Sequence, residues 1–200
     1  MSTLTLVEEM GTREVSSRLF WLLAMLGTPP GWASPTVHTP DPETGIESWS
    51  IKDRGFAVSL TQILPDQARA FFLGRGFPRD AAERYAEACV FMTIARNTGA
   101  APLELDLRGW RVSGIPGVER LETRETWLVI WQVQRLGESQ RIAFEWSQFP
   151  TTQAFEPGDW NQGMTTLKAG PDARFDLQLR WRSEGTDLTA TLDGVRCAAR

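Results

Sequence analysis

The side chains that could carry acid–base or metal chemistry are few in this chain. His38 is the single histidine, so a Ser–His or Cys–His pair would depend on one residue in a proline-rich segment. A zinc site needs about four ligands, which one histidine and two cysteines do not supply. Met92, Met164 and His38 could together bind soft copper, but Met92 lies in an apolar run typical of a core strand. We therefore predict no metal and no cofactor.

Paired carboxylates are the other chemical possibility. The pairs are Glu104 with Asp106, Glu156 with Asp159, and Asp172 with Asp176. Glu104 and Asp106 alternate with leucines, which places them on the wet face of a strand. A glycosidase needs two carboxyls that face each other across a cleft, and the spacing does not establish this. A carboxylate-dependent hydrolase is an alternative, but a solvated face is the simpler interpretation, and no catalytic residue is predicted.

The two cysteines, Cys89 and Cys197, are predicted to form one disulfide. Each stands at the end of an apolar run typical of a strand, so the bond would tie the last strand to the core. Neither belongs to a C-x-x-C motif, so a thioredoxin-like role is not indicated. This prediction depends on export to an oxidising compartment; in a reducing compartment both would be buried thiols.

The N-terminus indicates export. Arg13 and Arg18 precede an unbroken apolar run, residues 19–26, and Gly, Pro and Ala follow it. This order is typical of a signal peptide, and the run is too short to span a bilayer. We predict a signal peptide over 1–33, cleaved after Ala33, and a periplasmic or secreted protein. Three glutamates before the run are unusual there, so translation could start later, at Met10 or Val15.

A net charge of −4 without a basic patch argues against nucleic acid as a partner. Nucleotide-binding loops are also missing from the sequence, since the glycines of residues 74–76 are too few for a dinucleotide fingerprint. Nine tryptophans against one tyrosine are the most unusual feature of the composition. Most of these tryptophans are expected in the core, although one or two could form a carbohydrate-binding platform.

The segment 155–164 is the best candidate for a binding surface. It combines aromatic, acidic and amide side chains with glycine and proline, and long loops on a rigid scaffold commonly carry binding. The tentative binding residues are Phe155, Asp159, Trp160, Asn161 and Met164. A structural role is the other interpretation, in which Trp160 plugs the end of the fold and Asp159 caps the turn.

The pattern of the remaining chain predicts a mainly β fold with helical insertions. Residues 34–47, rich in proline, are predicted to be a linker arm, and 48–200 a single domain. Period-2 alternation predicts strands at 56–63, 89–95, 103–107, 142–146 and 175–192, the last range as a hairpin. Pro65 and Pro78 open a helical hairpin over about 65–88. One further helix is expected at about 123–136, which ends before Gly137.

Short strands with polar turns, few helices and one disulfide favour an antiparallel β-sandwich. The stretch 90–103 (Val-Phe-Met-Thr-Ile-Ala-Arg-Asn-Thr-Gly-Ala-Ala-Pro-Leu) resembles the central hairpin of many bacterial immunoglobulin-like domains. The resemblance covers under a tenth of the chain. It implies an immunoglobulin-like β-sandwich and carries no function.

These features favour an exported, non-enzymatic binding or accessory protein. Its partner would be a protein of the cell envelope, contacted near Trp160 and the helical hairpin, and no stable membrane span is expected after cleavage of the signal. A secreted carbohydrate-binding module that uses exposed tryptophans is the second hypothesis, and the hydrolase is the third. Exposed apolar surface, coplanar tryptophans or facing carboxylates would distinguish the three. The sequence does not indicate an oligomeric state.

Overall fold

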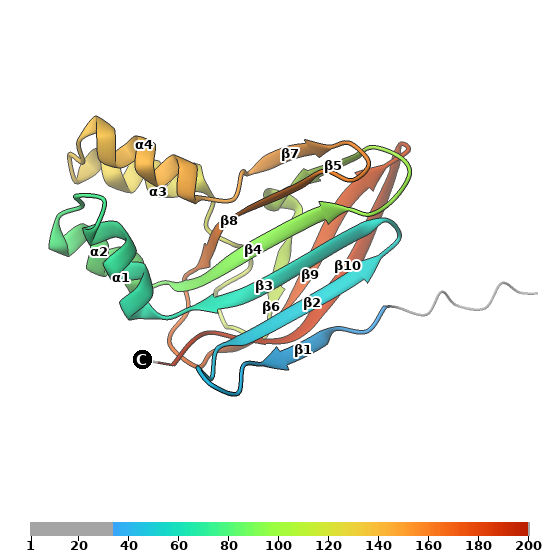
Figure 1. The fold of residues 1–200 in the computed structure, drawn as a ribbon, viewed down its shortest axis with the longest axis horizontal. Helices are drawn as coiled ribbons and strands as arrows, with labels where there is room; N and C mark the ends of the chain where they lie inside the picture. Colours follow the sequence, from blue (N-terminus) through green and yellow to red (C-terminus); the bar gives the residue numbers. More distant parts are fainter. Residues whose placement is uncertain (1–33, 200) are drawn as a thin grey trace, which may run out of the picture. The chain divides into compact units, whose positions relative to one another are not determined.

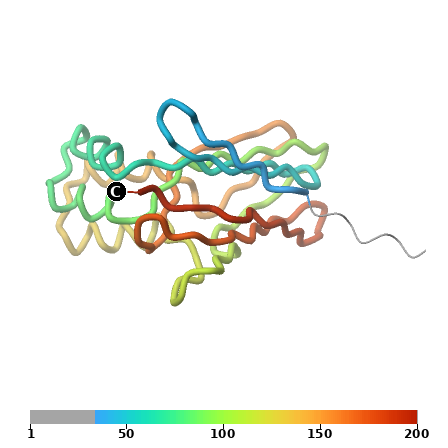
Figure 2. Tube along the Cα trace, turned by 90° about the horizontal axis from the view of Figure 1, so that it is seen from below, coloured from blue at the N-terminus to red at the C-terminus, as the bar shows by residue number. Residues whose placement is uncertain are grey.

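Two antiparallel β-sheets and four α-helices make up the described part of the protein (Figure 1). The computed structural model describes residues 34–199, and the predicted signal peptide lies outside them. The two sheets form two layers, and the helices gather at one end of both (Figure 2). The prediction of a mainly β fold with helical insertions is therefore confirmed.

The first sheet has the strand order β1-β2-β3-β4-β8, with every neighbouring pair antiparallel. Its strands are β1 (Val37–Pro40), β2 (Glu47–Asp53), β3 (Phe56–Ile63), β4 (Cys89–Asn97) and β8 (Trp160–Leu167). Arg54 and Gly55, in the turn between β2 and β3, both have positive φ. Strand β1 forms within the segment predicted as a linker arm, and its His38 lies opposite Trp49 of β2.

The second sheet has the order β10-β9-β5-β7, and β6 also pairs with β9. Its strands are β5 (Leu103–Asp106), β6 (Arg111–Ser113), β7 (Thr152–Phe155), β9 (Arg174–Ser183) and β10 (Thr186–Arg196). A short 3-10 helix, η1 (Leu107–Gly109), separates β5 from β6. The predicted hairpin at the C-terminus is confirmed as β9 and β10.

The main core lies between the two sheets and follows from the alternation in their strands. Phe56, Val58 and Leu60 of β3 are buried, and so are the alternate residues of β9 from Phe175 to Trp181. Removing an aliphatic or aromatic side chain of this size from water stabilises the fold by about 1.5–3 kcal/mol. The alternation thus fixes which face of each strand lies inward.

The expected hairpin between β4 and β5 is wrong. Strand β4 pairs with β3 and β8 in one sheet, and β5 pairs with β7 and β9 in the other. The buried amide of Asn97 fixes this crossing, because it donates to the carbonyls of Ala101 (2.8 Å) and Phe155 (3.1 Å). Alternation shows that one face is buried but does not choose the neighbouring strand. The stretch that resembles an immunoglobulin-like hairpin therefore joins two sheets.

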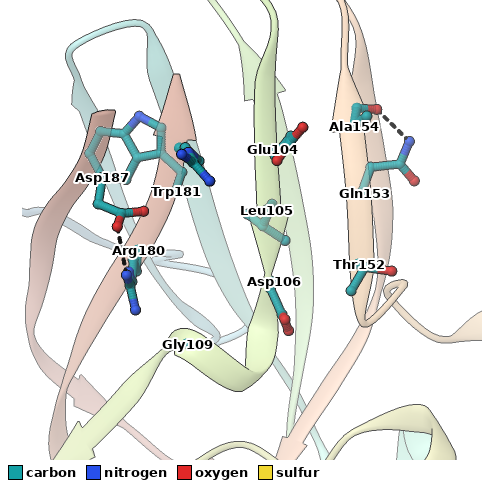
Figure 3. Close-up of a pocket in the computed structure, with 11 residues that line it drawn as sticks. Glu104, Leu105, Asp106, Gly109, Thr152, Gln153, Ala154, Arg180, Trp181 and Asp187 are labelled. Carbon is teal, nitrogen blue, oxygen red and sulfur yellow. Dashed lines mark hydrogen bonds and ion pairs between the residues drawn. The ribbon is translucent and has the colours of Figure 1, made fainter. Parts of the chain in front are cut away.

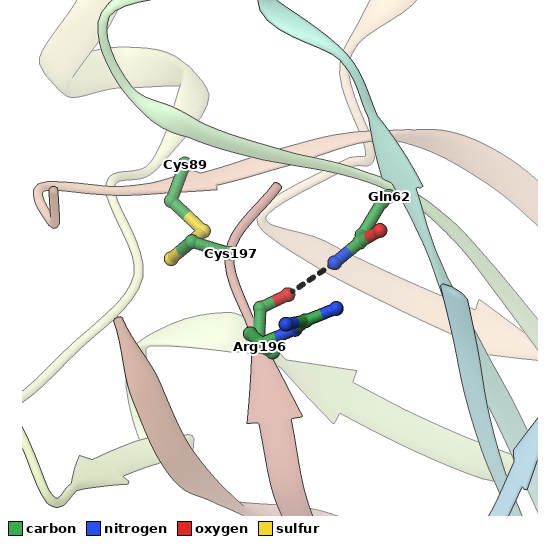
Figure 4. Close-up of a disulfide and its surroundings, with 4 residues drawn as sticks. All are labelled: Gln62, Cys89, Arg196 and Cys197. Atoms are coloured by element: carbon green, nitrogen blue, oxygen red, sulfur yellow. Dashed lines mark hydrogen bonds between the residues drawn. A yellow bond between two sulfur atoms is a disulfide. The ribbon is translucent and has the colours of Figure 1, made fainter. Parts of the chain in front are cut away.

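The predicted disulfide joins Cys89, at the start of β4, to Cys197, just after β10 (Figure 4). Their Cα atoms are 5.3 Å apart, within the usual range for such a bond. Both residues are buried in the main core. Since β4 and β10 belong to different sheets, the bond connects the two layers.

The helices form two hairpins. The first, α1 (Pro65–Leu73) and α2 (Arg79–Ala86), confirms the predicted hairpin. The second consists of α3 (Arg124–Val133), which confirms the further helix, and α4 (Glu138–Ser147). A strand was expected at 142–146, and this expectation is wrong. Residues 138–141 include good helix formers, and the helix that begins there continues through 142–146. Alternation over only five residues therefore does not determine the conformation of this segment.

A second core lies between the two helical hairpins and the ends of β4 and β8. Its large members are aromatic: Phe72, Phe77, Tyr85, Trp127, Trp131 and Phe144. Two buried hydrogen bonds attach the helices to the sheet region. The Tyr85 hydroxyl donates to Gln148 (2.8 Å), and the Trp127 indole N–H donates to Thr166 of β8 (2.8 Å). Burial raises the pKa of Tyr85, which keeps the hydroxyl protonated as a donor.

Gly163 of β8 is expected to tolerate no side chain. A Cβ atom there would lie 2.2 Å from the backbone nitrogen of Phe149, which donates to Met164 at 2.9 Å. Gly163→Ala should therefore lower the free energy of unfolding in urea by about 1–3 kcal/mol or more, because a backbone segment must move. Gly170→Ala, with open space around the site, is the control, and we expect a change within about 0.5 kcal/mol. Equal stability of the two variants would contradict the prediction.

Candidate functional site

The five tentative binding residues do not form one surface. Phe155 ends β7 and is buried in the main core, whereas Met164 of β8 is buried in the second core. Asp159 and Trp160 are exposed, and Asn161 is half-buried. The expected loop is thus only a short turn, residues 156–159, which connects β7 of the second sheet to β8 of the first.

Two polar side chains of this segment form hydrogen bonds, one within the segment and one to the neighbouring strand β7. The Asp159 carboxylate accepts from the backbone N–H of Glu156 (2.9 Å), and the Asn161 amide donates to Gln153 (3.2 Å). Trp160 remains 53% exposed, with the guanidinium carbon of Arg96 5.9 Å from its ring centroid. The segment therefore offers one aromatic ring, backed by a cation.

A shallow hollow of about 520 Å³ lies on the outer face of the second sheet (Figure 3). Its polar lining includes Glu104, Asp106, Arg180, Arg182 and Asp187. Glu104 and Asp106 stand on one strand, as expected for a wet face, and do not oppose each other across a cleft.

Two of the carboxylates in the hollow are paired with arginines. Asp187 bonds to Arg180 at 2.7 Å, and Asp106 accepts from the Arg108 guanidinium at 2.9 Å. The Arg108 hydrogen bonds hold the pKa of Asp106 below its usual value. A catalytic acid in a glycosidase has a raised pKa, so this arrangement resembles a solvated sheet face more closely than a catalytic pair.

Two tryptophans are exposed among the seven in residues 34–199: Trp146 on α4 and Trp160 on β8. The other five are buried, which confirms that most tryptophans of the described chain belong to the core. The two exposed rings lie on different elements, one on α4 and one at the start of β8.

The α3–α4 hairpin carries the most distinctive exposed surface. Of the large hydrophobic side chains that are exposed within residues 34–199, four lie on these two helices: Val129, Val133, Ile142 and Trp146, between 49% and 85% exposed. The other three, Val37, Leu73 and Trp160, are dispersed over β1, α1 and β8. Such concentration on one hairpin is unlike the scattered apolar residues of an ordinary surface.

Helical geometry places the four residues opposite the second core. Val129 and Val133 each lie two positions after a buried tryptophan of α3, or about 200° around the helix. Ile142 and Trp146 stand two positions on either side of the buried Phe144 of α4. Because α3 and α4 lie side by side over the second core (Figure 1), these residues form the outer face of one helical layer.

The charges on this outer face are mostly acidic. Glu125, Glu138 and Glu145 are exposed, with Arg135 as the one exposed cation in residues 124–147. Arg124 and Arg141 are half-buried, and the Arg124 guanidinium lies 3.5 Å from the carboxylate of Glu125, which also accepts from the Thr151 hydroxyl. We define the outer face as the four apolar residues together with the three glutamates.

The sequence contains a four-residue spacing that marks this face, although the alternation at 142–146 suggests a strand there. Glutamate and apolar residues recur at intervals of four, as Glu125, Val129 and Val133, and again as Glu138, Ile142 and Trp146. Residues four apart share one side of a helix. Each helix therefore has a second apolar stripe besides the buried one, which is unusual for a helix that packs on one side only.

No family model, curated protein or solved structure matches this chain. Within the described residues, no helix is both long enough and apolar enough to cross a membrane. The functional interpretation therefore depends on the geometry and chemistry of the site.

Proposed function

We propose that this protein is an exported, non-enzymatic binding or accessory protein, and that it binds a protein of the cell envelope through the outer face of α3 and α4. The observation that carries the proposal is the exposure of Val129, Val133, Ile142 and Trp146 on one helical layer. Burying such side chains against a partner is favourable by about 25 cal/mol per Å² of apolar surface.

Export is supported by the disulfide between Cys89 and Cys197, because such bonds persist mainly in oxidising compartments. The proposed signal peptide over residues 1–33 also supports export. Sequencing the N-terminus of the protein isolated from its native host should find Ser34 as the first residue. A mature chain that retains the apolar run 19–26 would contradict cleavage there.

The two alternatives have less support. A carbohydrate-binding module would use Trp146 and Trp160, which stand on separate elements. A hydrolase would use Glu104 or Asp106, but Asp106 is bound to Arg108. Two carboxylates of the hollow are paired with arginines, whereas the outer face of α3 and α4 gathers four exposed apolar side chains.

Photo-crosslinking tests the proposed binding face. A photoreactive phenylalanine analogue at position 133, which is 78% exposed, should give one discrete protein adduct in the native host. The same group at the exposed Glu156, on the turn between β7 and β8, is the control and should give none. Trp146→Ala in the position-133 chain should reduce the adduct at least about fivefold, since a lost aromatic contact of 1–2 kcal/mol changes affinity by that factor or more. Equal adducts from both positions would contradict the proposal.

A further inference from the structure

We infer that the outer face of α3 and α4 binds an amphipathic helix of the partner, with an apolar stripe in its middle and a basic residue at each end. This inference rests on the proposed function and adds the chemistry of the occupant. It is carried by the order of residues along the two helices and by the charges that border the face.

The two helices present matching ridges. Glu125, Val129 and Val133 follow one another at intervals of four on α3, and the same order recurs on α4. The connection between the helices, residues 134–137, is short, so the helices run antiparallel. The glutamates that begin the two ridges therefore lie at opposite ends of the layer, with the apolar residues between them.

These dimensions suit one helix. Val133 lies eight positions after Glu125, or about 12 Å further along α3. A partner helix with basic residues seven or eight positions apart would place one beside each glutamate, and its apolar residues would lie between the two ridges. This is the helix-in-groove mode, in which anchors recur at three- and four-residue intervals.

The size of the face disfavours a second copy of this chain. Ten residues in each helix give a layer about 15 Å long and about 20 Å wide, or roughly 300 Å². A stable protein dimer buries about 800 Å² on each partner. A single short helix covers the smaller area.

The charges on the outer face distinguish between the remaining candidates for its binding partner. In a symmetric dimer, Glu125, Glu138 and Glu145 would face the glutamates of the second copy, which is unfavourable. An anionic membrane surface would be repelled by the same carboxylates. A helix with lysine or arginine at both ends is the occupant that these charges attract.

Two matched peptides test the inference. Both are blocked 14-residue helices with the same leucine stripe; one has lysine at each end of the stripe and the other has glutamate. At low ionic strength, NMR titration of the full mature chain should show that the lysine peptide binds at least about tenfold more tightly. Shifted resonances should map to α3 and α4.

Variants then locate the effect. Glu138→Gln should reduce the preference for lysine several-fold, and Glu125→Gln/Glu138→Gln should bring the two peptides within about twofold. Glu156→Gln, which removes an exposed charge elsewhere, should leave the preference unchanged. Val133→Asp should abolish binding of both peptides, and circular dichroism confirms that each variant is folded.

The possible failures are distinguishable from failure of the proposed function. Equal affinity for the two peptides, or no binding of either while the position-133 adduct persists, would overturn the basic helix and leave the binding face intact. Dimerisation in sedimentation that Val133→Asp removes would assign the face to a second copy. Cosedimentation with phosphatidylglycerol vesicles that Trp146→Ala removes would assign it to the membrane. Either of these last results also overturns the inference.

Discussion

Reduction of the disulfide between Cys89 and Cys197 should lower the free energy of unfolding by about 4–5 kcal/mol. The bond joins residues 108 positions apart, and closing a loop of that order restricts the unfolded chain strongly. Small domains are stable by only about 5–15 kcal/mol. The reduced protein should therefore remain folded at room temperature but with a much lower melting temperature.

The loss should act mainly through the unfolded chain. The C-terminal strand keeps other attachments after reduction: the Gln62 amide donates to the carbonyl of Arg196 (2.9 Å, Figure 4), and the Cys197 N–H donates to Ala173 (2.9 Å). An unfolded chain without the cross-link is more expanded and exposes more surface. The dependence of stability on urea, the m-value, should therefore rise on reduction.

Urea unfolding followed by circular dichroism can check both effects. The oxidised protein, the reduced protein and the Cys89→Ala/Cys197→Ala variant should be compared, and the last two should agree within about 1 kcal/mol. The intact mass should show two alkyl groups added only after reduction. Identical unfolding midpoints for the oxidised and reduced protein would argue against a stabilising disulfide.

Local sequence signals were sufficient to predict the elements that begin or end at proline or glycine. Pro65 occupies the first position of α1, Pro78 caps α2 and Gly74 ends α1. Proline fixes φ and lacks the N–H that a helix start leaves unpaired, so the first helical hairpin could be predicted from the sequence. The β9–β10 hairpin was equally clear, because two alternating runs flank one polar turn.

Pairing between distant segments could not be predicted in the same way. The alternation of Leu103 and Leu105 predicts a strand but contains no information on whether it pairs with β4 or with β9. The second helix of the α3–α4 hairpin was missed for a related reason. Spacing by two residues would put Ile142, Phe144 and Trp146 on one face of a strand, whereas in the helix Phe144 lies on the opposite side from Ile142 and Trp146.

The binding segment expected from the sequence and the exposed apolar face lie in different kinds of element. A loop rich in glycine and aromatics suggested binding at 155–164, yet the neighbouring strands bury Phe155 and Met164 in separate cores. The face on α3 and α4 becomes visible only when both segments are known to be helices. A core aromatic and a surface aromatic have the same residue type, so burial had to come from the structure.

Trp131→Ala should lower the free energy of unfolding by about 3–5 kcal/mol. Trp131 is fully buried in the second core, where it stacks on Trp127 (centroids 5.1 Å apart) and contacts the rings of Phe77 and Phe144. Its indole N–H has no hydrogen-bond partner in the described structure, so the loss comes from packing. Removing the ring would leave a cavity among aromatic groups that cannot collapse readily.

The matched control is Trp146→Ala in the same hairpin, where the side chain is 85% exposed. Its stability should change by no more than about 0.5 kcal/mol, while the position-133 adduct weakens. Hydrogen exchange in Trp131→Ala should accelerate first in the four helices, because the second core is separate from the core between the sheets. Uniform acceleration in strands and helices would instead indicate that both cores unfold as one unit. A large loss of stability in Trp146→Ala would mean that the exposed ring supports the fold, and would remove the basis for assigning it to a partner.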